Sequence, residues 1–148
     1  MSLREEVVIE IDKIDELLES YRDLFKKVET QRPNIIEIAA LASIIQSFYM
    51  GIENILKRIA KKEKINIENQ SSWHKELLKN IADKGIISNE LWLDYLDDFR
   101  AIRHVFIHNY SHFYEWEEMK EIVMKTEDTW DKTKKEIYLY LNNLKDKY

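Results

Sequence analysis

The chain has 148 residues, of which 45% are hydrophobic, and its formal net charge is −5. This length and apolar content predict one folded domain over residues 1–148 and exclude a disordered chain. The absence of cysteine excludes a disulfide framework and a thiolate metal site. The acidic balance disfavours a general nucleic-acid coat, because affinity for phosphate backbones comes mainly from Lys and Arg.

The scarcity of helix breakers predicts an all-α fold, since the chain contains two glycines and one proline. We expect an up-and-down helical bundle of four to five helices. No apolar run approaches the ~20 residues that span a bilayer. The N-terminal stretch MSLREEVVIEIDK is too acidic and mixed for a signal peptide. We therefore expect a cytoplasmic protein without a membrane segment.

Apolar residues at three- and four-residue steps predict a first helix over residues 3–28 and, after Pro33, a second helix over residues 34–62. The second helix opens with IIEIAALASII, which is apolar nearly all round, so we expect it to be the most buried. Gly51 inside it costs about 1 kcal/mol of helix stability relative to alanine, which indicates a close contact with another helix. So broad an apolar surface favours a bundle over a coiled coil, and we expect part of it to be buried against a second copy.

Three further helices are predicted in the second half of the chain. The polar segment KINIENQSS is interpreted as a loop. Ser72 then caps a short helix over residues 73–84, which Gly85 closes. Ser88 caps the next helix, and the last helix spans residues 115–145.

Residues 103–110, RHVFIHNY, carry the strongest functional signal and lie near the C-terminal end of the helix that Ser88 begins. Three of the four histidines of the chain are at positions 104, 108 and 112. An arginine can hold a phosphate, and an imidazole can move protons near neutral pH. Together they are sufficient for phosphodiester cleavage without a metal ion.

Arg103, His108 and Tyr110 form the pattern R-x4-H-x-Y, which resembles the motif of HEPN domains and in particular of the HepT toxins. The resemblance implies a small all-helical ribonuclease that is paired with MntA, a minimal nucleotidyltransferase antitoxin. It implies that Arg103 and His108 are the catalytic pair, in a cleft at a homodimer interface, and that the antitoxin adenylylates Tyr110. His104 fills the place of the polar residue that often follows the arginine in this family.

Helical geometry separates the two predicted catalytic residues. Four apolar residues share the core face of the motif helix: Tyr95, Phe99, Ile102 and Phe106. Arg100, His104 and His108 follow at four-residue steps on the opposite, polar face, and Arg103 lies on the flank, about 140° from His108. Either the helix loosens over residues 107–109, or the site is composite, with groups from two subunits.

A metal site is the alternative chemistry for the histidines. The spacing H-x3-H of His104 and His108 places two imidazoles on one helix face, and His112 could add a third. The chain lacks the glutamate of an H-E-x-x-H motif and has no cysteine, so we expect no metal and no cofactor. These histidines could also be plain polar residues of an amphipathic helix.

The other candidates also have structural interpretations. Arg100 could simply pair with Asp97, and Tyr110 could be an ordinary, partly buried aromatic residue. Asn109 could bind substrate, or it could end the helix, which is the interpretation we favour. The basic run from Lys57 to Lys64 could supply a local field for RNA, but we favour a solvated helix end, where cations suit the helix dipole.

We therefore predict a HepT-like toxin, a metal-independent endoribonuclease that forms a homodimer and is silenced when a partner nucleotidyltransferase adenylylates it. Arg103 and His108 would be catalytic, Arg100, His104 and Asn109 would bind the RNA substrate, and Tyr110 would be modified. His104 could instead supply the second proton-transfer group. The alternative is a non-catalytic helical subunit that binds substrate or partner for a minimal nucleotidyltransferase. A plain dimeric helical scaffold is the third possibility.

Overall fold

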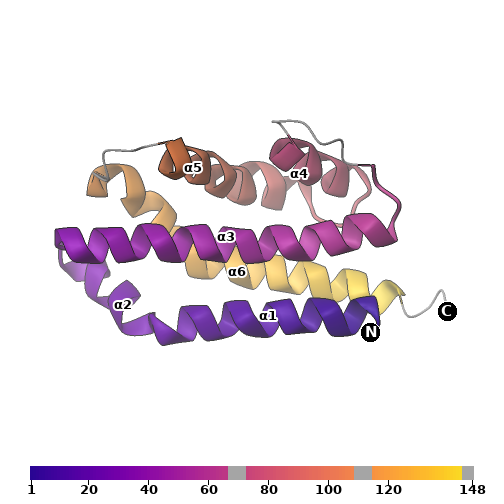
Figure 1. Cartoon of the computed structure of the whole chain (residues 1–148), viewed down its shortest axis with the longest axis horizontal. Helices are drawn as coiled ribbons and strands as arrows, with labels where there is room; N and C mark the ends of the chain where they lie inside the picture. The colour runs from indigo at the N-terminus through magenta and orange to yellow at the C-terminus, as the bar shows by residue number, and fades with distance from the viewer. Residues whose placement is uncertain (67–72, 109–114, 145–148) are drawn as a thin grey trace.

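Helices account for nearly all of the chain that the computed structural model describes, which is residues 1–66, 73–108 and 115–144, with the backbone alone at residues 107 and 108. This confirms the predicted all-α fold, and no strand occurs in these ranges. The helices in chain order are α1 (Leu3–Ser20), α2 (Arg22–Thr30), α3 (Ile35–Lys62), α4 (Trp73–Asp83), the π-helix η1 (Leu91–Leu96), α5 (Asp97–His108) and α6 (Trp116–Leu144) (Figure 1).

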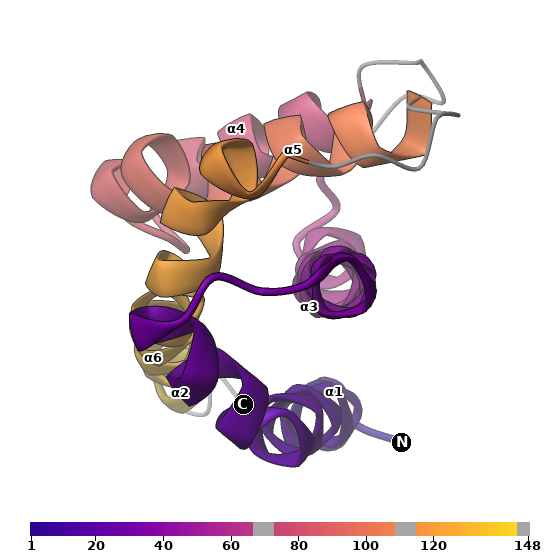
Figure 2. The same cartoon turned by 90° about the vertical axis from the view of Figure 1, so that its left-hand side faces the viewer.

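The predicted first helix is divided, so the described residues form six α-helices rather than four or five. The break falls at Tyr21, whose φ of −113° and ψ of 16° are not helical. The row of buried apolar residues is also interrupted at this position, because Tyr21 is 42% exposed while Phe25 and Val28 beyond it are buried. The turn lets α2 contact α6 as α1 does (Figure 2).

The central helix of the bundle is α3, which contacts α1, α4, α5 and α6 (Figure 2). Its start follows from a capping box: the Asn34 side chain accepts from the Glu37 N–H at 2.8 Å, and the Asn34 N–H donates to the Glu37 carboxylate at 3.0 Å. Such caps contribute about 1 kcal/mol. As predicted, α3 contributes more buried residues than any other described helix.

The composition of α3 reflects this central position. By length and apolar content alone it is the one described helix that could cross a membrane, with a mean hydropathy of 1.7 over an 18-residue window. Packing against four other helices requires the same apolar surface. Gly51 provides the predicted close contact, since a Cβ at this position would lie 2.8 Å from Cγ1 of Ile14 on α1.

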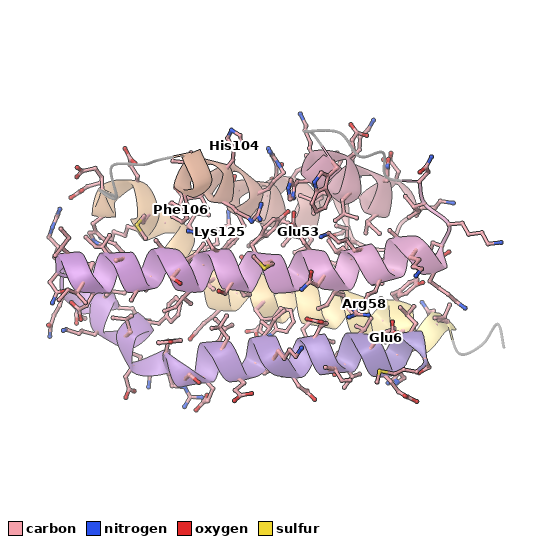
Figure 3. All side chains as sticks on the ribbon, in the orientation of Figure 1. Glu6, Glu53, Arg58, His104, Phe106 and Lys125 are labelled. Carbon is pink, nitrogen blue, oxygen red and sulfur yellow. The ribbon has the colours of Figure 1, made fainter. Side chains whose placement is uncertain are left out.

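The segment between α4 and α5 has the predicted caps but not the predicted regular helix. Gly85 has a φ of +74°, and the N–H groups of Gly85 and Ile86 bind carbonyls of the last turn of α4. The Ser88 hydroxyl accepts from the Leu91 N–H at 3.1 Å. The helix that follows is π-helical over η1 before it becomes α5. Lys125 of α6 holds this junction, since its Nζ binds the Asp94 carbonyl at 2.5 Å and the Asp98 carboxylate at 2.7 Å (Figure 3).

The core joins the motif helix to the rest of the bundle. Phe48 of α3 makes edge-to-face contacts with Phe99 of α5, with ring centroids 5.3 Å apart, and with Trp130 of α6, at 6.1 Å. Phe106 is also buried, and Tyr95 and Ile102 are partly buried against the core. The predicted core face of α5 is therefore confirmed, and it fixes the direction in which the remaining side chains of α5 project.

Candidate functional site

The candidate site is built on α5, which lies along α3 with α4 beside it (Figure 1). Arg100 and Arg103 are three residues apart, so they are neighbours on one side of this helix. Both are partly buried rather than fully exposed. Arg100 is thus partly buried like Arg103, although we expected it on the polar face with His104, which is exposed.

Arg100 is held by a neighbour on its own helix. Its Nε donates to Oδ1 of Asp97 at 2.7 Å, which is the pairing that the sequence suggested. A guanidinium carries five N–H donors in a planar fork. Arg100 therefore keeps donors on its two terminal nitrogens that make no hydrogen bond to other described residues, and these could bind an anion.

Arg103 differs from Arg100 because no hydrogen bond or ion pair joins its guanidinium to another side chain in the described part of the chain. Its positive charge acts on the pKa of Tyr49 on α3. Burial raises the pKa of the Tyr49 phenol well above its usual value, the Glu53 carboxylate raises it further, and the charges of Arg100 and Arg103 oppose this increase. Both guanidinium charges therefore act on the ionisation of the Tyr49 hydroxyl.

The Tyr49 hydroxyl is buried and has no hydrogen-bond partner within the described ranges. One turn further along α3, Oε2 of the buried Glu53 lies 2.5 Å from Nδ1 of His74 on α4. The His74 ring also stacks on the ring of Trp73, with centroids 3.6 Å apart. We call Tyr49, Glu53, His74, Arg100 and Arg103 the polar cluster.

The sequence prediction missed the three members of the polar cluster outside α5. A signal was present in α3, because Glu53 is the only acidic residue between Glu37 and Glu63 in an otherwise apolar helix. A carboxylate in such a position needs a polar partner. The partner comes from α4, however, and no local pattern connects Glu53 with His74.

His104 lies apart from the polar cluster. It is exposed, on the side of α5 that is turned away from α3, whereas Glu53 lies between α3 and the layer formed by α4 and α5 (Figure 3). Arg58 is also separate, because it faces α1, where it binds Glu6 at 3.1 Å and Glu10 at 3.5 Å (Figure 3).

The other predicted site residues lie at the end of α5. His108 is the last residue of this helix, and its side chain is outside the described part of the structure. Asn109 and Tyr110 lie outside the described residues altogether, so the roles assigned to them stay predictions. Within the described ranges, no group of three or more His, Asp or Glu side chains is placed to hold a metal ion.

The family model described as HepT-like protein matches residues 40–144. The chain belongs to the HepT-like family. This confirms the resemblance suggested by Arg103, His108 and Tyr110. The HepT-like match covers most of α3 and all of α4, η1, α5 and α6, so it contains the entire polar cluster. No curated protein and no solved structure matches the chain.

Proposed function

We propose that this HepT-like chain is a toxin that cleaves RNA endonucleolytically without a metal ion. The observation that carries the proposal is the state of Arg103, whose guanidinium is partly buried on α5 and makes no ion pair within the described ranges. An unpaired guanidinium near low-dielectric surroundings binds phosphate strongly, because water and carboxylates compete less for it.

The chemistry is a transesterification within the RNA chain. The ribose 2′-oxygen attacks the adjacent phosphorus, and the bond to the 5′-oxygen breaks, which leaves a cyclic 2′,3′-phosphate and a 5′-hydroxyl. Arg103 stabilises the developing negative charge, and His108 acts as general base or general acid. Arg100, His104 and Asn109 bind the RNA. DNA lacks the 2′-hydroxyl and is not cleaved.

The net charge of −5 is compatible with a local RNA site. Within the polar cluster the charge of Arg100 is offset by Asp97, whereas that of Arg103 is available to the substrate. A positive charge concentrated at one site attracts a phosphate even though the protein as a whole is acidic.

Control of the toxin would come from a second protein in the cytoplasm, a minimal nucleotidyltransferase of the MntA type. This antitoxin would transfer an adenylyl group to Tyr110, two residues beyond His108. The added phosphate and adenosine would occupy the RNA site beside Arg103. A homodimer would bring groups from two subunits to one cleft.

The test is cleavage of single-stranded RNA by the purified chain in the presence of EDTA. We expect cyclic 2′,3′-phosphate ends, and we expect Arg103→Ala and His108→Ala to lower the rate by ~10²–10⁴-fold. The matched control is Arg22→Ala, since Arg22 is exposed on α2, where it pairs with Glu19 at 2.7 Å.

A folded Arg103→Ala variant with unchanged cleavage would remove this residue from the mechanism. If the unmodified chain cleaves no RNA but accepts adenylyl groups from a nucleotidyltransferase, the alternative of a non-catalytic helical subunit is favoured instead.

A further inference from the structure

His74 is held by contacts with two neighbouring side chains, and neither the family motif nor the proposed mechanism uses it. Its Nδ1 lies 2.5 Å from Oε2 of Glu53, and the Glu53 side chain is 2% exposed. Its ring stacks on Trp73, and Nζ of Lys57 lies 4.3 Å from the centroid of the Trp73 ring on α4. The imidazole is thus fixed from two directions.

The position of His74 brings it into the polar cluster. Helices α3, α4 and α5 contact one another in all three pairs. Glu53, the partner of His74, is the largest electrostatic influence on the Tyr49 hydroxyl after burial, and Arg100 and Arg103 act on the same hydroxyl. Glu53, the partner of His74, and the two guanidinium groups of α5 therefore all act on the same buried phenol.

The pairing of His74 with Glu53 determines which ring nitrogen can act. A carboxylate that accepts from Nδ1 fixes the orientation of the ring, and the other nitrogen, Nε2, is then available for chemistry. The His74 side chain is 26% exposed, so a ligand can reach part of the ring. An imidazolium at this position carries one N–H for Glu53 and one for a substrate.

The proposed RNA cleavage needs two proton transfers, and each subunit supplies one motif histidine to which the resemblance gives such a role, His108. We propose that His74 is a second catalytic residue, the general acid that protonates the leaving 5′-oxygen of RNA, with Glu53 as its positioning residue. This inference rests on the proposed ribonuclease function. It gives His104, which lies on the outer side of α5, a role in binding phosphate only.

The 2′-hydroxyl gives its proton to His108 as the 2′-oxygen forms a bond to phosphorus. The bond between phosphorus and the 5′-oxygen breaks, and Nε2 of His74 gives its proton to that oxygen. Arg103 and Arg100 hold the phosphoryl oxygens. His74 ends neutral and His108 protonated, and exchange with water restores both.

The experiment compares two RNA dinucleotides, one with the natural 5′-oxygen and one with a bridging 5′-sulfur. A thiolate leaves without protonation, so a missing general acid affects only the natural substrate. We expect His74→Gln to lose ~10²–10⁴-fold in kcat on the natural dinucleotide and less than about threefold on the sulfur analogue. Glu53→Gln should give a smaller loss with the same dependence on the leaving group. Lys75→Gln, an exposed position on α4, is the matched control and should equal the unmodified chain on both substrates.

Three results are decisive. If His74→Gln loses kcat equally on both dinucleotides, His74 is not the general acid. Unchanged activity of folded His74→Gln on the natural dinucleotide would overturn this role as well. Should His74→Gln fail to fold by circular dichroism, Glu53→Gln decides by the same comparison. Failure of the unmodified chain to cleave either dinucleotide or longer RNA would instead refute the ribonuclease function itself, and the role of His74 with it.

Discussion

The charge of Arg103 on α5 opposes the increase in the pKa of the Tyr49 phenol on α3, whose hydroxyl is buried without a hydrogen-bond partner in the described part of the chain. A fold keeps such a group at a cost, since an unsatisfied buried hydroxyl destabilises a protein by about 1–3 kcal/mol. Its position inside the polar cluster connects stability with the candidate site.

Tyr49→Phe should leave the free energy of unfolding unchanged or raise it by about 1 kcal/mol, because the ring is kept and the unsatisfied hydroxyl is removed. Tyr140→Phe is the matched control. The Tyr140 hydroxyl donates to Oε1 of Glu63 at 2.6 Å, so its loss should lower the free energy by about 1 kcal/mol. Urea denaturation followed by circular dichroism measures both. A strongly destabilised Tyr49→Phe would show that this hydroxyl has a partner.

Gly51→Ala should destabilise the bundle by about 1–3 kcal/mol although alanine is the better helix former. The new methyl group would lie 2.8 Å from Cγ1 and 2.9 Å from Cδ1 of Ile14, which is itself buried. Ser47→Ala, at an exposed position one turn earlier on α3, should change stability by less than about 0.5 kcal/mol. An increase in stability for Gly51→Ala would contradict the close contact of α1 with α3.

Tyr110 should be the control point of the toxin. Incubation with ATP, magnesium and the cognate nucleotidyltransferase should raise the mass of the chain by one or more AMP units and abolish RNA cleavage, because the added phosphate competes for Arg103. Tyr110→Phe should block the first addition, whereas Tyr21→Phe, at an exposed tyrosine near the start of α2, should not. Peptide mass spectrometry that places every AMP elsewhere would refute the assignment.

The chain should be a dimer at micromolar concentration, with a sedimentation mass near twice its 18.0 kDa. The apolar side chains of Ile36 and Met50 project from one side of α3 into solvent, with exposed fractions of 77% and 48%. Met50→Glu should shift the equilibrium towards monomer, and Leu139→Glu, at an exposed position on α6, serves as the control. A monomeric unmodified chain would rule out the composite site.

Much of this fold was predictable because its signals are local. The Asn34 and Ser88 caps, the Gly85 terminus and the core face of α5 all follow from residues within a turn or two of one another. The break at Tyr21 was not predictable in this way, because apolar residues continue at helical spacing on both sides of it and no glycine or proline marks the turn.

The candidate site was predictable to the extent that it lies in the eight-residue motif. Arg103 was identified as a candidate and its role stays a prediction, whereas the pairing of Arg100 with Asp97 follows from their spacing. The contact of Glu53 with His74 joins two helices across a loop, so it depends on tertiary packing that no periodicity records.

The π-helical turn ahead of α5 has a consequence for the motif. A π-helix accommodates an extra residue within a helix, and each residue of an α-helix turns the chain by about 100°. The winding of the six residues of η1, which precede the motif, therefore determines the direction in which Arg100 and Arg103 project from α5. Two chains with the same R-x4-H-x-Y letters but different winding at this point would present their arginines to different neighbours.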